Sequence, residues 1–110
     1  YEKMGSCCAA AKIHVLASWF ETTGLVSLEA GLAGCNVVAA GERAREYLGD
    51  FAEYCDPGSI DSIAEAIVRV WEKQPDPGFK KHILENYTWE KTAEQTLAAY
   101  EVVSGISYLV

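Results

Sequence analysis

The sequence predicts an α/β fold built on a parallel sheet with helices packed against it. Two apolar runs without alternation, at residues 13–17 and 36–40, are typical of strands that are covered on both faces. Segments in which apolar residues recur at helical spacing follow these runs, at residues 25–32 and 60–71. Strands that alternate with helices along a chain indicate a parallel sheet.

The composition limits the classes of function. The chain has 110 residues, half of them hydrophobic, which suits one domain at most with a packed core. Its 9 basic and 16 acidic residues give a net charge of −7. This excess excludes general binding to nucleic acid or to an anionic membrane surface, because both carry negative charge.

Targeting and metal-binding signals are missing from the sequence. The apolar stretches are interrupted by polar residues and are too short to span a bilayer, and the first residues lack the pattern of a secretory signal. The four cysteines show no CxxC spacing, so neither a zinc site nor a disulfide framework is predicted. We expect a reducing, cytoplasmic setting in which buried cysteines act as small hydrophobic residues.

A change in the spacing of apolar residues predicts the first strand and the helix that follows it. Residues 1–12 are typical of the end of a helix, and the apolar, partly β-branched run at 13–17 predicts a strand. Leucines then recur at helical spacing between residues 25 and 32. Thr22-Thr23-Gly24 precedes this helix as a start signal, and Gly34 follows it as a stop signal.

The rest of the chain repeats this order. The remaining predicted elements are a strand, a helical turn, a brief strand and two helices, at residues 36–40, 45–48, 51–55, 60–71 and 89–100. Ser59 and Thr88 are the predicted N-caps of the two helices. The Pro-rich stretch at 74–78 is a loop between helices inside one domain.

Three short parallel strands make a poor free-standing sheet, because both edges are left unprotected. The chain also begins inside a helical segment and without an initiator Met. We therefore expect residues 1–110 to form a single partial domain of a larger enzyme.

The connection between the first strand and its helix, at residues 18–29, is the best candidate for a ligand site. In parallel sheets ligands bind beyond the carboxyl ends of the strands, where the amide groups of helix N-termini carry partial positive charge. Glu21 and Glu29 stand on either side of the helix start, and Gly24 permits close approach to the backbone. Because carboxylates accept hydrogen bonds from sugar hydroxyls and the amides hold phosphate, the arrangement predicts binding of a sugar nucleotide.

These residues could also have a purely structural role instead of binding a ligand. Ser18 and Glu21 have the spacing of a capping box. Glu29 also suits a solvated helix position, and Gly24 also suits a plain turn.

Other conspicuous residues are assigned to structure rather than to the site. His14 lies in an apolar run and is predicted to be a hydrogen-bonded core histidine, and Arg45 is predicted to be a solvated surface charge. The three tryptophans are predicted to be packing residues rather than sugar-stacking surfaces: Trp19, Trp71 and Trp89.

The longer string around the candidate site carries a family pattern. Residues 13–38 read IHVLASWFETTGLVSLEAGLAGCNVV, in which seven residues separate Glu21 from Glu29. Further segments follow in the matching order: REYLGD at 45–50, CDP at 55–57 and YTWE at 87–90. Together they resemble the C-terminal domain of the family 4 glycosyltransferases, over about residues 10–100.

This resemblance implies two Rossmann-like domains that face a cleft, the arrangement termed GT-B, with this chain as the latter half of the C-terminal domain. It implies transfer of a sugar from a nucleotide-sugar donor to an acceptor with retention of configuration, in carbohydrate biosynthesis, without a metal or other cofactor. The implied site consists of Glu21 as the catalytic residue at the donor sugar, Glu29 at the ribose hydroxyls, Thr22, Thr23, Gly24 and Leu25 at the sugar and phosphates, and Glu46 in an indirect role near the nucleotide.

The implied partners are the donor, an acceptor that the sequence does not identify, and the N-terminal portion of the same enzyme. That portion would carry the acceptor domain and the basic groups that neutralise the diphosphate. The implied location is the cytoplasm, or the inner membrane surface through that portion. We therefore expect the 110 residues alone to bind nucleotide weakly and to show no turnover.

Two departures from the family pattern bear on the donor. Thr22 stands where glycine is common, which limits the approach of the backbone to the sugar, and Asn36 stands where proline is frequent. The first departure predicts an altered donor preference. Two other functions are alternatives: a non-catalytic assembly or regulatory module, and a sugar-nucleotide epimerase with the same two-domain layout.

Overall fold

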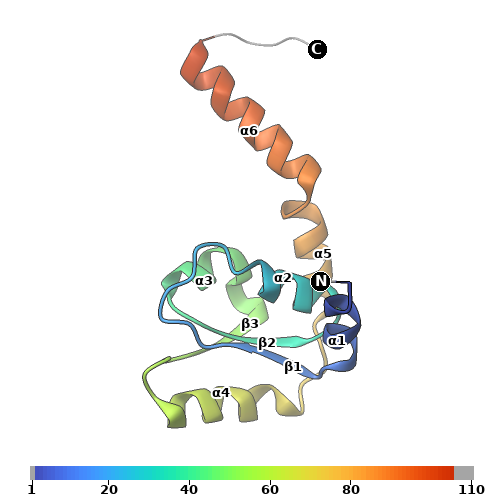
Figure 1. Ribbon diagram of the computed structural model, residues 1–110, viewed down its shortest axis with the longest axis vertical. Coiled ribbons are helices and arrows are strands. Elements are labelled where there is room, and N and C mark those ends of the chain that lie inside the picture. Colours follow the sequence, from blue (N-terminus) through green and yellow to red (C-terminus); the bar gives the residue numbers. More distant parts are fainter. Residues whose placement is uncertain (1, 106–110) are drawn as a thin grey trace. The chain divides into compact units, whose positions relative to one another are not determined.

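The computed structural model describes residues 2–105 and confirms the α/β fold. In chain order the elements are α1 (Met4–Ala10), β1 (Ile13–Leu16), α2 (Leu25–Leu32), β2 (Asn36–Ala40), α3 (Glu42–Leu48), the 3-10 turn η1 (Gly49–Phe51), β3 (Ala52–Cys55), α4 (Ile60–Trp71), α5 (Pro77–Asn86) and α6 (Trp89–Ser104) (Figure 1). The chain divides into two compact units, residues 1–80 and residues 81–110.

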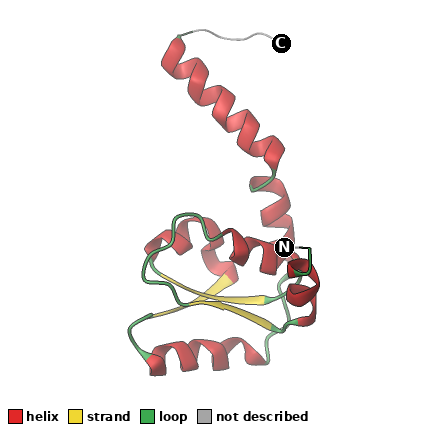
Figure 2. Cartoon of the chain, in the orientation of Figure 1, coloured by secondary structure: helices red, strands yellow, loops and turns green. Residues whose placement is uncertain are grey.

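The first unit is built on a three-stranded parallel sheet in the order β1-β2-β3 (Figure 2). Ile13 of β1 lies opposite Asn36 of β2, and Ala40 at the end of β2 lies opposite Cys55 of β3. All three strands therefore end at the same edge of the sheet, as the sequence predicts.

Helices cover both faces of this sheet. Figure 1 shows α2 and α3 over one face and α4 over the other. The α4 side holds a core cluster of Val38, Ala40, Cys55, Ala66 and Val70. The neighbouring Val37, on the other face of β2, is also fully buried. Burial on both faces explains why the apolar run of β2 lacks alternation.

Local capping groups fix the helix boundaries. The Ser59 hydroxyl accepts a hydrogen bond from the Ser62 amide at 3.2 Å, and the Thr88 hydroxyl accepts one from the Lys91 amide at 3.3 Å. Both predicted N-caps are confirmed. Gly34, with a φ of 99°, follows α2 as the predicted stop signal.

Two strands are one residue shorter than predicted. Pairing of β1 with β2 ends at Leu16, so Ala17 belongs to the connection toward α2. Phe51 lies in η1 rather than in β3, and its ring stacks on Phe79 with centroids 5.2 Å apart. The apolar character of Phe51 suggested that it belongs to a strand. In the structure its side chain packs on Phe79 instead, and its backbone does not pair with β2.

In the second unit, apolar residues lie along one side of α6. Trp89, Ala93, Leu97 and Tyr100 line one hollow along this helix, of about 410 Å³. No residue of α6 is fully buried.

Candidate functional site

The β1–α2 connection lies at the carboxyl edge of the sheet, where the sequence places the ligand site. Glu21 is partly buried in this connection, and its Oε1 accepts a hydrogen bond from the Thr22 amide at 3.1 Å. Thr22 and Thr23 are exposed. The start of α2 is therefore presented together with one carboxylate and two hydroxyl groups.

The start of α2 excludes the capping-box alternative. The helix begins at Leu25 with Gly24 as its N-cap, and no side chain caps it. Ser18 lies well before this point, so its spacing to Glu21 has no capping role. Gly24 adopts left-handed backbone angles, φ 47° and ψ 39°, and its carbonyl accepts a hydrogen bond from the Ser27 amide at 2.9 Å.

Tyr47 of α3 closes over Gly24. A Cβ atom at Gly24 would overlap the Tyr47 hydroxyl and would stand 2.8 Å from its Cζ. The hydroxyl oxygen is shielded from solvent, and burial together with the nearby Glu21 carboxylate raises the pKa of Tyr47. Gly24 and Tyr47 are thus in contact, and Glu21 is close enough to act on the Tyr47 hydroxyl electrostatically. The sequence did not predict this arrangement, because Tyr47 comes from a different element.

Glu29 lies on the side of α2 that faces α1. It lines a hollow of about 350 Å³ whose other walls are Met4, Gly5, Cys8, Leu32 and Ala33. Glu21 is not among the residues of this hollow. The two predicted carboxylates therefore do not share it: Glu21 lies before the start of α2 and Glu29 about one turn beyond it.

Glu46, the predicted indirect contact, is an exposed residue of α3. Leu25 is exposed as well, at the first turn of α2. Neither residue lines the hollow beside Glu29.

Arg45 is more than the solvated charge that the sequence predicts. Its guanidinium lies over the Tyr54 ring, 3.9 Å from the ring centroid, and Glu42 is 3.7 Å from its Nε. These residues line a small hollow of about 170 Å³ at the carboxyl ends of β2 and β3. Burial raises the pKa of Tyr54 to about 12, against the opposing effect of the Arg45 cation.

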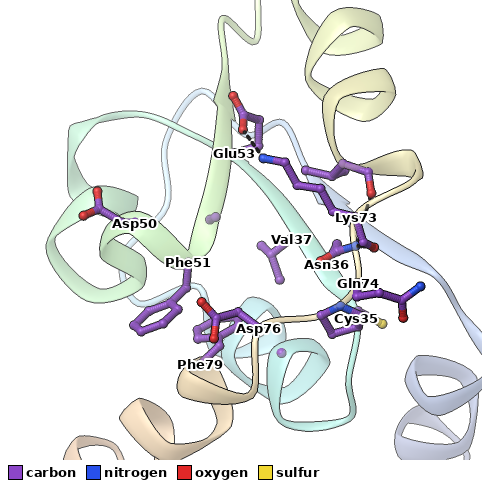
Figure 3. A pocket seen from close by; sticks show the side chains of 14 residues that line it. Cys35, Asn36, Val37, Asp50, Phe51, Glu53, Lys73, Gln74, Asp76 and Phe79 are labelled. Carbon is purple, nitrogen blue, oxygen red and sulfur yellow. Dashed lines mark hydrogen bonds and ion pairs between the residues drawn. The ribbon is translucent and has the colours of Figure 1, made fainter.

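Another hollow, of about 320 Å³, lies at the opposite edge, where β2 and β3 begin (Figure 3). Three of its polar side chains have partners within its own walls: Lys73 is 3.5 Å from the Glu53 carboxylate, and the Asn36 amide donates to the Lys73 carbonyl at 2.8 Å. None of the predicted site residues lines it. It is therefore a structural feature of the α4 terminus rather than part of the candidate site.

His14 has the structural role that the sequence predicts. Its Nε2 is 3.3 Å from the hydroxyl of Ser27, which is fully buried in α2. Burial lowers the pKa of His14. His14 itself is partly buried, and the pair joins β1 to the first turn of α2.

The prediction of packing is wrong for Trp19, which is 78% exposed, and for Trp89, which is 87% exposed. Trp71 is half-exposed, with the Lys12 ammonium 4.9 Å from the centroid of its ring. Aromatic character alone predicts burial, but Trp19 comes after β1 has ended, where the chain has left the core.

Within residues 2–105, no three His, Cys, Asp or Glu side chains are grouped in a way that could hold a metal ion. No helix of the described chain has the length and apolarity needed to cross a membrane. The chain matches no protein-family model, no curated protein and no solved structure.

Proposed function

We propose that this chain forms the nucleotide-binding half of the donor site in a retaining glycosyltransferase. The observation that carries the proposal is the hollow beside α2, in which the Glu29 carboxylate stands against mostly apolar walls from α1 and α2. A nucleoside has the matching chemistry, since a flat base suits apolar walls and vicinal ribose hydroxyls donate to a carboxylate. The resemblance of residues 13–38 to the family pattern supports the same assignment.

The spacing along α2 suits a nucleoside diphosphate. Glu29 follows Leu25 by four residues, a rise of about 6 Å along the helix axis. A diphosphate that extends from the ribose over this distance reaches the N-terminal amides of α2, where the helix dipole favours negative charge. Gly24 does not itself open toward the ligand, because Tyr47 fills the space that a Cβ at Gly24 would take.

Glu21 then stands where the donor sugar would begin. One of its oxygens is held by the Thr22 amide, which fixes the direction of the carboxylate. Its remaining acceptor capacity suits sugar hydroxyls. In the transfer the bond between the anomeric carbon and the diphosphate oxygen breaks with its electron pair on the diphosphate, the bond from the anomeric carbon to the acceptor oxygen forms, and the proton of the acceptor hydroxyl passes to the departing diphosphate. The α2 amides stabilise that leaving charge.

A nitrogen–proton correlation NMR titration of the 110-residue chain with uridine, guanosine and adenosine diphosphates tests this proposal. Since one half of the predicted cleft lies outside these residues, we expect a Kd of about 1 mM for the preferred nucleotide, with shifts concentrated at the amides of residues 23–29. Glu29→Gln should weaken this binding about tenfold, through loss of a charged acceptor. Glu72→Gln is the matched control, because Glu72 is an exposed glutamate at the end of α4.

Two results would overturn the proposal. One is the absence of amide shifts with all three nucleotides at 10 mM, about ten times the expected Kd. The other is binding that Glu29→Gln and Glu72→Gln change equally.

A further inference from the structure

Two adjacent aromatic side chains stand in solvent at the carboxyl edge of the sheet. Trp19 is 78% exposed and Phe20 is 83% exposed, and both precede Glu21 in the β1–α2 connection. Single exposed apolar residues are ordinary, but two consecutive exposed aromatic residues beside a candidate ligand site indicate a binding surface.

The structure holds Trp19 in place rather than leaving it loose. The outer edge of its indole lies against Gly58, in the turn between β3 and α4, where a Cβ atom would stand 2.7 Å from the ring. That turn is itself fixed, because the Asp56 carboxylate accepts from the Gly58 amide at 2.9 Å and the Asp56 amide donates to the Ser62 hydroxyl at 2.9 Å. Contact at one edge leaves most of the ring surface open.

The polar groups next to these rings favour one class of ligand. Glu21, Thr22 and Thr23 follow directly in the chain and offer a carboxylate and two exposed hydroxyls. A pyranose ring has an apolar C–H face, which suits the electron-rich face of an indole, and a rim of hydroxyls, which suits carboxylate and hydroxyl partners. An anionic sugar is disfavoured at this position by the neighbouring Glu21 carboxylate.

We propose that Trp19 and Phe20 form a stacking surface for a neutral pyranose, with Glu21 and the two threonines binding its hydroxyls. The inference rests on the proposed function, since it assigns a place for the sugar of the donor or of the acceptor. It names neutral carbohydrate as the substrate class at this edge.

The test uses the full 110-residue chain and its three indole N–H signals in NMR spectra. The probes are methyl α-D-glucopyranoside and methyl α-D-mannopyranoside, with sorbitol as a polyol that has hydroxyls but no ring face. We expect a pyranoside to shift the Trp19 signal with a Kd of about 10 mM, while sorbitol and the Trp89 signal show no saturable change.

Three variants sharpen this test. Trp19→Ala should weaken pyranoside binding about tenfold, and Trp19→Phe should restore most of it, because a ring face is retained. Trp89→Ala is the matched control, since Trp89 is equally exposed but lies in α6. A Trp19 signal that does not move with either pyranoside, or that moves equally with sorbitol, overturns the proposal.

Two further arms identify the source of the sugar and separate the two proposals. If a nucleotide sugar displaces the pyranoside while its nucleoside diphosphate does not, the donor sugar occupies the surface; if both bind together, the surface takes the acceptor. Nucleotide shifts at residues 23–29 without pyranoside shifts at Trp19 overturn the stacking surface alone. Pyranoside shifts without any nucleotide binding overturn the proposed function and leave a sugar site.

Discussion

The phenol of Tyr47 lies against the Cα of Gly24, so that any side chain at Gly24 would overlap the Tyr47 hydroxyl. Gly24 is both buried and in the left-handed region, with a φ of 47°. Gly24 is therefore required for two independent reasons: its φ is positive, and Tyr47 leaves no room for a Cβ atom. Both features fix the position of the start of α2.

Gly24→Ala should destabilise the fold by about 2–4 kcal/mol, from left-handed strain plus overlap with Tyr47. Urea denaturation followed by circular dichroism measures the loss. In a double-mutant cycle with Tyr47→Leu, the double variant should be more stable than the sum of the single effects predicts, by at least about 1 kcal/mol. Additive effects would show that the contact contributes nothing to the cost.

Asn36→Ala should destabilise the first unit by about 1–2 kcal/mol, because the side-chain amide donates to two carbonyls at the end of α4. These carbonyls belong to Val70, at 3.2 Å, and Lys73, at 2.8 Å. Asn36→Pro should cost more, since it also removes the hydrogen bond from the Asn36 amide to the Lys12 carbonyl. Gln74→Ala, at an exposed position nearby, is the control for urea denaturation. Equal stability of Asn36→Pro and the parent chain would contradict this account.

Stability should fall as the pH drops below about 6.5, in part because of His14. Burial lowers the pKa of His14 in the folded state, so the unfolded chain binds a proton at higher pH than the folded chain does. The stabilisation is therefore present above the unfolded pKa and is lost as the pH falls toward the folded value. Denaturation at pH 7.5 and 5.5 should show a smaller loss in His14→Gln than in the parent, because His14→Gln removes the group that titrates. Parallel slopes for His14→Gln and the parent would rule out this linkage.

Much of the fold could be predicted from the sequence, because local chemistry determines it. The uninterrupted apolar run of β2 signals burial on both faces, and Ser59 and Thr88 each satisfy an amide of the turn that follows. Gly34 ends α2 because its positive φ is accessible to glycine. None of these features depends on residues far away in the chain.

The side-chain arrangement could not be predicted in the same way, because it depends on contacts between distant elements. Tyr47 reaches Gly24 from α3, the apolar walls beside Glu29 come partly from α1, and Trp19 is placed by Gly58. The amino-acid composition and the spacing of apolar residues carry no information on contacts between residues that are far apart in the chain. The separation of Glu21 and Glu29 by seven residues did not indicate that these two residues lie in different surroundings.

The most direct measurement of the central claim compares a nucleoside diphosphate with its 2′,3′-dideoxy form in the parent chain and in Glu29→Gln. If Glu29 binds the ribose hydroxyls, removal of these hydroxyls weakens binding about tenfold in the parent and leaves Glu29→Gln almost unchanged. An equal loss in both proteins, or no nucleotide binding by the parent, would contradict the assignment of this hollow to the donor nucleotide.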